Sequence, residues 1–405
     1  MKKKICISLI LAVVLATSVC FVACDKTAPK GEVVEKTSIV YLGDSIAEAL
    51  IGPSPVSERD NYGYYALVGK CNNFAYYNHS VSGHKTSTGM TGGDGLLEVL
   101  LRDTEDANLL LTHLKEADII HISVLGNNVL QYDLGLLMLE VADPEFPQKY
   151  EEGTTLLNAL HDGGVMTRDA IKKSAIAAGE TTVEFNFPET YNNICDIVAR
   201  LRELNADAKI VFQKVYNPVY EGTTLLYSEA KTKLAEITDD GRFGAEGEKI
   251  TTFAQMRLVA QAILDKLNGM LDEYLEEHPD AFYILDVNKE FDDVTKLDAK
   301  DGKPNLSNDS LGAQLLFTDW THPSNFGHAM VFNATQKLFE TLGIAGPNVL
   351  DEYKKIRLEQ LERMFAPIEG FDVQGAKDAV NGADDIYGVS RAYFDAIDGY
   401  TPVNY

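Results

Sequence analysis

Two short motifs, far apart in the sequence, carry a hydroxyl, a carboxylate and an imidazole. Gly43-Asp44-Ser45 follows the apolar run 39–42, and Asp319-Trp-Thr-His322 lies near the other end of the chain. Serine is a poor nucleophile at neutral pH, so it needs an imidazole to accept its proton and a carboxylate to orient that imidazole. Side chains three residues apart can meet on one helical turn. The motifs therefore predict a nucleophilic Ser45 with His322 as its base and Asp319 as the orienting acid.

Polar, glycine-containing turns follow two further apolar runs. Phe74–His79 predicts a strand leading into Ser80–Gly83, and Ile119–Leu125 predicts one leading into Gly126–Asn128. In open α/β folds, ligands bind at the carboxyl ends of parallel strands. A glycine backbone N–H and an asparagine side-chain amide are suitable donors to an oxyanion in acyl transfer. We therefore expect Gly83 and Asn128 to lie near Ser45.

The order and strand-end placement of these blocks resemble the SGNH, or GDSL-like, hydrolase family over roughly residues 38–343. The resemblance implies that Ser45, Asp319 and His322 form a catalytic triad. It also implies an oxyanion hole made by the backbone amides of Ser45 and Gly83 and the side chain of Asn128. Two positions depart from the family pattern, because Ile46 replaces the usual leucine and Val129 replaces a common aspartate. The second departure leaves Asn127 as an alternative to Asn128.

The pattern of apolar runs predicts an α/β fold, with five strands alternating with helices. The expected strands are 39–42, 74–79, 119–125, 209–215 and 282–287. Amphipathic helices are expected over 193–204, 253–277 and 326–342, with a further one over 350–365. Such alternation is typical of a parallel sheet covered on both faces. The family resemblance implies the same architecture: a three-layer α/β/α sandwich with a flavodoxin-like, mostly parallel five-stranded sheet.

Four parts of the chain are expected: a signal peptide (1–23), a tether (24–37), the hydrolase domain (38–343) and a C-terminal helix with a Gly- and Asp-rich tail (344–405). Stretches of about 130–190 and 219–252 exceed what the sheet needs. Because they leave strand ends on the side of the site, we expect them to form pocket walls.

Each block alone also has a purely structural interpretation. Asp44-Ser45 could cap a helix, Gly83 could serve a turn, Asn128 could cap a helix end, and Asp319 with His322 could precede the next helix as a capping pair. His328 lies six residues after His322, but this spacing matches no zinc motif. The predicted chemistry requires neither a metal nor an organic cofactor.

The N-terminus carries a secretory signal. Lys2–Lys4 precede the uncharged stretch 5–23, and Phe21-Val-Ala-Cys24 ends it in a lipobox-like sequence. This segment resembles bacterial lipoprotein signals, which implies a lipidated Cys24 that anchors the chain on the extracytoplasmic face of the membrane. An uncleaved membrane anchor and cleavage by an ordinary signal peptidase remain alternatives, and both also place the domain outside the cytoplasm.

The net charge bears on nucleic-acid binding, and the cysteine content bears on disulfide formation. The formal charge is −25, which makes nucleic-acid binding unfavourable. In the folded part only Cys71 and Cys195 remain, and we expect them to be free thiols, with a disulfide as the alternative. The sequence does not predict the oligomeric state.

Together the motifs predict an extracytoplasmic serine esterase that cleaves a short acyl group, such as acetyl, from a glycan or small molecule. Two alternatives remain at this stage. The first is an O-acyltransferase acting on a cell-surface glycan, which would use the same groups with an alcohol as acceptor. The second is a non-catalytic surface binding module, which predicts that Ser45 and His322 lie too far apart to form a hydrogen bond.

Overall fold

A parallel sheet of five strands, in the order β2-β1-β3-β4-β5, forms the centre of the structure. The computed structural model describes residues 36–50, 56–88, 93–102, 105–129, 138, 142, 187–222, 232, 234–319 and 321–403. The strands are β1 (Ser38–Gly43), β2 (Ala75–Asn78), β3 (Ile119–Ser123), β4 (Lys209–Gln213) and β5 (Tyr283–Leu285). This is the flavodoxin-like strand order, with its switch point between β1 and β3. The predicted fold class and all five predicted strands are confirmed.

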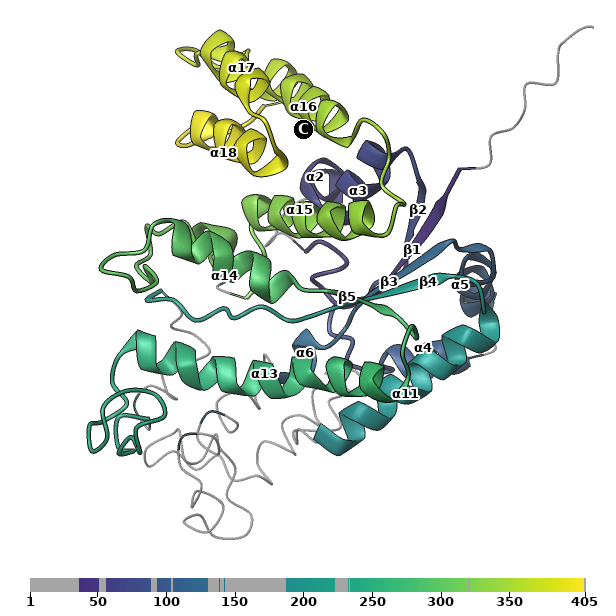
Figure 1. Cartoon of the computed structure of the whole chain (residues 1–405). Coiled ribbons are helices and arrows are strands. Elements are labelled where there is room, and N and C mark those ends of the chain that lie inside the picture. The colour runs from purple at the N-terminus through teal and green to yellow at the C-terminus, as the bar shows by residue number, and fades with distance from the viewer. Residues whose placement is uncertain are drawn as a thin grey trace, which may run out of the picture. The chain divides into compact units, whose positions relative to one another are not determined.

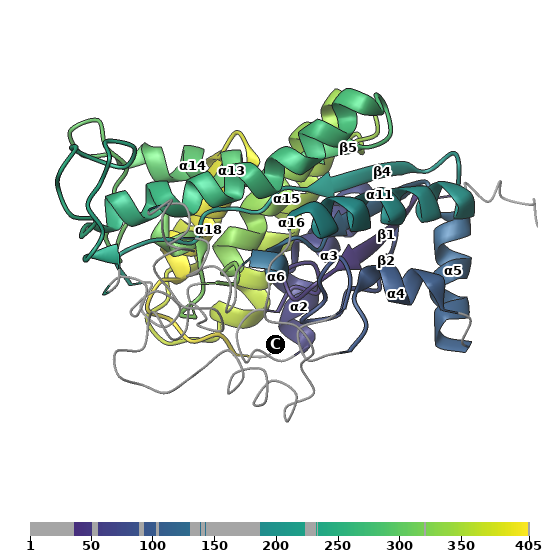
Figure 2. The same cartoon turned by 90° about the horizontal axis from the view of Figure 1, so that it is seen from below.

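Helices cover both faces of the sheet (Figures 1 and 2). One face packs against α4 (Leu96–Leu101), α5 (Glu105–Glu116), α11 (Phe187–Leu204) and α13 (Phe253–Glu277). The other face packs against α2 (Val56–Tyr62), α3 (Tyr64–Asn72), α14 (Val287–Leu297) and α15 (Asn325–Thr341). Because both faces are buried, the strands are almost continuously apolar, as is typical of parallel sheets. Two shorter helical elements are α6 (Gly126–Val129) and η1 (Ala313–Leu315).

Side-chain caps explain where two of the predicted helices begin. The Thr252 hydroxyl accepts a hydrogen bond from the Gln255 amide at the start of α13, and Gln255 completes a capping box. The Ser324 hydroxyl accepts a hydrogen bond from the Gly327 amide at the start of α15. The cap of α15 is important for the site, because Ser324 lies only two residues after His322.

The C-terminal region contains more helices than the sequence suggested. After α16 (Val349–Gln360) and its continuation η2 (Leu361–Phe365), the expected tail instead forms α17 (Val373–Gly382) and α18 (Ile386–Ile397). Asp372 and Asp385 cap these two helices by accepting hydrogen bonds from Gly375 N and Gly388 N. The sequence analysis assigned no helix to this stretch, although Asp372 with Gly375 and Asp385 with Gly388 belong to helix N-termini.

The C-terminal helices belong to the same compact unit as the sheet, which spans Thr37–Tyr405, and they pack over α15 and α3 (Figure 1). Arg357 of α16 shows how they are attached. Its side chain is fully buried, and its guanidinium lies 4.9–5.4 Å from the ring centroids of Tyr62, Tyr353, Tyr393 and Phe394. One cation therefore joins α2, α16 and α18 through cation–π contacts.

Parts of the predicted organisation lie outside the described residues. These are the signal peptide, Cys24, the tether up to residue 35, most of the insertion at 130–190 and residues 223–231 of the second insertion. Within the described part of the chain, no helix combines the length and hydrophobicity needed to cross a membrane.

Candidate active site

Ser45 lies immediately after β1, beside the switch point of the sheet. The chain turns there so tightly that a Cβ atom on Gly43 would lie 2.0 Å from the Ser123 carbonyl oxygen of β3, so only glycine fits. The Asp44 amide donates to the same carbonyl at 2.9 Å. The following residues form a helical turn in which Glu48 N donates to Asp44 O at 2.9 Å and Leu50 N donates to Ser45 O at 2.8 Å. This turn fixes the backbone of Ser45 at the carboxyl edge of the sheet.

The three predicted triad residues lie together. His322 Nε2 lies 2.7 Å from Ser45 Oγ, and His322 Nδ1 lies 2.6 Å from Asp319 Oδ2. With Nδ1 protonated towards the carboxylate, Nε2 is free to accept the serine proton. The binding-module alternative predicted that Ser45 and His322 would be separated, and the 2.7 Å contact goes against it.

The second Asp319 oxygen organises the loop that carries the histidine. Oδ1 accepts hydrogen bonds from the amides of Thr321 and His322, both at 3.0 Å. Burial raises the pKa of the Asp319 carboxyl, but the hydrogen bonds from the His322 side chain and the Thr321 amide outweigh it and hold this pKa below its usual value. Asp319 is therefore a charged acceptor at neutral pH, as an orienting carboxylate must be.

Asp44, which the sequence suggested only as a helix cap, is a buried acid next to the nucleophile. Its Oδ1 accepts a hydrogen bond from Ile46 N at 2.9 Å. Burial raises the pKa of the Asp44 carboxyl to about 7, against the opposing effects of this hydrogen bond and of nearby His322. This buried carboxyl therefore lies one residue from the proposed nucleophile.

The loop that follows β2 places Gly83 beside the Ser45 turn. Val81 N donates to Gly43 O at 2.9 Å, which continues the pairing of this chain with β1. Gly83 has φ +86°, in the region that favours glycine, and no described residue other than its chain neighbours lies within 4 Å of the position its Cβ would take. Among the described residues, the backbone amides of Ser45 and Gly83 have no hydrogen-bond acceptor. Both amides are therefore available to a developing negative charge.

Glu48 connects the two segments that carry these amides, and nothing in the sequence pattern indicated it. Its Oε2 accepts hydrogen bonds from Ser82 N at 2.9 Å and Ser82 Oγ at 2.5 Å. Its Oε1 pairs with Arg59 at 2.5 Å. Burial raises the pKa of Glu48, but the hydrogen bonds from Ser82 and Arg59 outweigh it and lower the pKa below its usual value. Glu48 thus holds the residue before Gly83 against the Ser45 turn.

Asn128 is buried, and all of its side-chain polar groups have partners. Its Nδ2 lies 3.1 Å from Thr86 Oγ1 and 3.2 Å from Thr190 Oγ1, and its Oδ1 accepts from Thr86 N at 3.2 Å. The backbone N–H of Thr86 can only donate, which fixes the orientation of the Asn128 amide. An oxyanion would therefore have to replace one of the two threonine hydroxyls as the acceptor.

Asn127, the alternative, points to the neighbouring loop. Its Nδ2 donates to the His84 carbonyl oxygen at 3.0 Å. His84 itself is mostly buried, and burial lowers the pKa of its imidazole. Asn127 and Asn128 together tie the turn after β3 to residues 84–86, which follow Gly83.

His328, Cys71 and Cys195 have structural surroundings. His328 is fully buried in α15 and stacks on Tyr64 with ring centroids 5.8 Å apart. Among the described residues, no three His, Cys, Asp or Glu side chains gather in a way that could hold a metal ion. Cys71 and Cys195 are free, as expected, and pack on opposite faces of the sheet. Burial raises the pKa of the Cys71 thiol to about 12, which makes it unreactive.

Comparisons with known proteins give structural neighbours only, since no family model and no curated protein matches the sequence. An extracellular lipase from Streptomyces rimosus is 16% identical, with a TM-score of 0.40 over 73% of this chain and 96% of that chain. A protein described as a GDSL-like lipase from Parabacteroides merdae is 15% identical, with a TM-score of 0.37 over 78% of this chain and 100% of that one. A psychrotrophic esterase from Pseudoalteromonas is 11% identical, with a TM-score of 0.33 over 76% and 98%.

These neighbours are similar to the chain at 11–16% identity. The structure brings Ser45, Asp319 and His322 into one hydrogen-bonded line. It places Gly83 on a loop joined to the Ser45 turn, and Asn128 on a loop joined to the residues after Gly83. The predicted lipidation site, Cys24, lies outside the described residues.

Proposed function

We propose that this protein is a serine hydrolase that cleaves carboxylic esters through an acyl-Ser45 intermediate. The observation that carries the proposal is the unbroken line from Ser45 Oγ through the His322 ring to Asp319, with separations of 2.7 and 2.6 Å. In such an arrangement the histidine removes the serine proton as the hydroxyl attacks a carbonyl carbon.

In the first half of the reaction, Ser45 Oγ attacks the ester carbonyl while His322 Nε2 takes its proton. The carbonyl oxygen becomes negative and accepts hydrogen bonds from the backbone amides of Ser45 and Gly83 and from Asn128 Nδ2. His322 then gives its proton to the leaving alcohol, and the acyl group stays on Ser45. Asp319 stabilises the imidazolium and keeps the ring oriented throughout.

In the second half, His322 takes a proton from water, and the resulting hydroxide adds to the acyl carbon. Collapse of this intermediate returns the proton to Ser45 and releases the acid. The charge on the oxyanion is again held by the same donors. Water is therefore the second substrate, and no cofactor takes part in any step.

The proposed setting is the extracytoplasmic face of a cell membrane, with the chain anchored through lipidated Cys24. The support is the signal sequence and its lipobox-like end. In that setting we propose a short acyl group, such as acetyl on a glycan or small molecule, as the substrate. Replacing Cys24→Ala should release the protein from the membrane fraction, and retention of the variant there would contradict the anchor.

Ester hydrolysis is tested with p-nitrophenyl acetate, the full chain and its Ser45→Ala variant, beside a p-nitrophenyl ester of a long-chain acid. We expect turnover of the acetate that falls to background in Ser45→Ala, and slower turnover of the long-chain ester. Equal rates for the two proteins would overturn the serine mechanism. A preference for the long chain would retain the mechanism and overturn the short acyl group.

A further inference from the structure

The chain segment that leaves β4 runs from the sheet towards the loop that carries the triad acid and base. Lys214–Val219 follows β4 and belongs to no helix or strand. Lys214 N donates to Leu285 O at 2.9 Å, and the Asn268 side chain of α13 bonds both Val215 N and Val215 O at 2.9 Å. We refer to Lys214–Val219 as the β4 extension.

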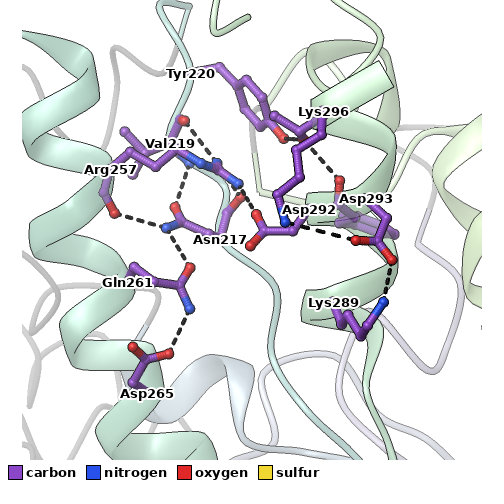
Figure 3. A network of polar contacts seen from close by, with 12 residues as sticks. Asn217, Val219, Tyr220, Arg257, Gln261, Asp265, Lys289, Asp292, Asp293 and Lys296 are labelled. Carbon is purple, nitrogen blue, oxygen red and sulfur yellow. Dashed lines mark hydrogen bonds and ion pairs between the residues drawn. The ribbon is translucent and has the colours of Figure 1, made fainter. Parts of the chain in front are cut away.

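Arg257 of α13 fixes the second half of the β4 extension, as Figure 3 shows. Its Nη1 donates to Asn217 O at 3.1 Å and Val219 O at 3.2 Å, while its Nη2 donates to Asp292 Oδ1 of α14 at 2.7 Å. Asn217 Nδ2 donates back to Arg257 O at 3.0 Å. Because this mostly buried side chain of α13 bonds both α14 and the extension, it holds the three segments in one geometry.

Tyr216, within this extension, reaches the triad loop. Its ring is fully buried and stacks on Phe291 of α14 with centroids 4.5 Å apart. Its hydroxyl donates to the carbonyl oxygen of Thr321 at 2.5 Å. Thr321 is the residue directly before His322, and its amide donates to Asp319 Oδ1 at 3.0 Å. The Tyr216 hydroxyl therefore holds the peptide that lies between the acid and the base of the triad.

We propose that Tyr216 is a positioning residue of the triad, held in place by the Arg257-fixed β4 extension. This inference rests on the proposed function, because it assigns Tyr216 to the orientation of the acid and base of that site. The physical reason is that a transfer of the serine proton depends on Ångström-scale placement of Nε2, and small displacements cost large factors in rate. The contacts between Asp319 and His322 set the shape of the triad loop. The hydrogen bond from Tyr216 to Thr321 joins this loop to the β4 extension.

The chain offers a matched control one residue beyond the β4 extension. Tyr220 is also fully buried, and its hydroxyl lies 2.9 Å from Thr295 Oγ1 of α14. Tyr216→Phe and Tyr220→Phe each remove one buried hydroxyl and keep the ring. The first removes the hydrogen bond to Thr321 in the triad loop, and the second removes the contact with Thr295 in α14. The comparison therefore separates positioning of the triad from a general contribution to stability.

The kinetic experiment measures hydrolysis of p-nitrophenyl acetate by the full chain and both variants. We expect Tyr216→Phe to lower kcat about tenfold, the effect of losing one hydrogen bond, with KM within about twofold of wild type. Tyr220→Phe should leave kcat within about twofold of wild type. We expect both variants to lower Tm by similar amounts, because each loses one buried hydroxyl. Equal kcat values for the two variants would overturn the proposal.

A second measurement reports the geometry without requiring turnover. The Nδ1 proton shared by His322 and Asp319 should give a far-downfield proton NMR resonance that is absent in Asp319→Asn. We expect it to move or broaden in Tyr216→Phe and to stay unchanged in Tyr220→Phe. An unchanged resonance in Tyr216→Phe would contradict the positioning role. If the wild type hydrolyses no ester, the proposed function fails, and this resonance still decides the role of Tyr216.

Discussion

The two halves of the candidate site differ in how far they are assembled in the absence of substrate. The acid–base half is complete, because Ser45, His322 and Asp319 already form consecutive contacts of 2.7 and 2.6 Å. In the oxyanion half, the amides of Ser45 and Gly83 have no acceptor among the described residues, and Asn128 is bonded to two threonine hydroxyls. In the proposed mechanism, proton transfer is thus prepared in advance, whereas Asn128 as the third oxyanion donor must exchange a partner when charge develops.

This difference follows from the chemistry that each half performs. A neutral serine, an imidazole and a carboxylate satisfy one another, so their line is stable before substrate arrives. Oxyanion donors face a charge that exists only during the reaction, and their contribution is specific to the transition state. Variants of the two halves should therefore affect catalysis to different extents.

The largest effect is expected from the acid–base half. Replacing Asp319→Asn should lower kcat by about 10⁴-fold, because an amide favours the wrong histidine tautomer and cannot stabilise the imidazolium. The measurement is steady-state hydrolysis of p-nitrophenyl acetate, with Asp309→Asn, an exposed acid in another loop, as the control. A fall of less than tenfold would show that Asp319 does not serve as the orienting acid.

A smaller effect is expected from the side-chain donor of the oxyanion half. Asn128→Ala should lower kcat by about 10²-fold with little change in KM, the usual cost of removing one oxyanion donor. Its neighbour supplies the control, since Asn127 donates to the His84 carbonyl, and Asn127→Ala should cost less than tenfold. The reverse ranking of the two variants would assign the oxyanion role to Asn127.

A still smaller effect should come from Glu48, which joins the Gly83 loop to the Ser45 turn. Glu48→Ala removes the acceptor for Ser82 N and Ser82 Oγ, so the Gly83 amide loses its support and kcat should fall about tenfold. Glu48→Gln keeps an oxygen acceptor for Ser82 and should restore most of the rate. If Glu48→Gln is as slow as Glu48→Ala, the ion pair with Arg59 matters more than the contact with Ser82.

Asp44 provides a test of stability rather than rate. Its pKa is raised from 3.8 to about 7 in the folded protein, so between these values the folded state binds more protons than the unfolded state. Ionising this carboxyl therefore costs folding free energy, and its effect on stability becomes less favourable as the pH rises through that window.

Asp44→Asn removes this titration. We expect the free energy of unfolding of the variant, relative to wild type, to increase by about 3 kcal/mol between pH 5 and pH 8, measured by urea unfolding at both pH values. Taking the difference between the two pH values cancels the constant effects of the substitution. A difference that does not change with pH would mean that Asp44 has an ordinary pKa.

Local sequence signals were sufficient to predict the strands of the sheet and the residues of the acid–base half. Apolar runs predicted all five strands, and α13 begins and ends at the predicted residues, Phe253 and Glu277. Asp319 and His322 could be paired from sequence because they are three residues apart.

Long-range contacts could not be predicted in this way. Glu48 meets Ser82, and Tyr216 meets Thr321, only because the sheet brings distant segments together. The helices α17 and α18 were missed although Asp372-x-x-Gly375 and Asp385-x-x-Gly388 each carry a capping residue. The apolar spacing of Ile386, Val389 and Tyr393, all buried in the structure, was the available helical signal.

The most direct test of the central claim is covalent labelling of Ser45. A fluorophosphonate reacts with a serine hydroxyl only where a base and an oxyanion hole activate it, whatever ester the enzyme prefers. We predict a single adduct on Ser45, found by mass spectrometry of peptides, that is absent in Ser45→Ala and forms far more slowly in His322→Ala. Labelling that is absent from the wild type, or that persists in His322→Ala at the wild-type rate, would contradict an activated serine in this site.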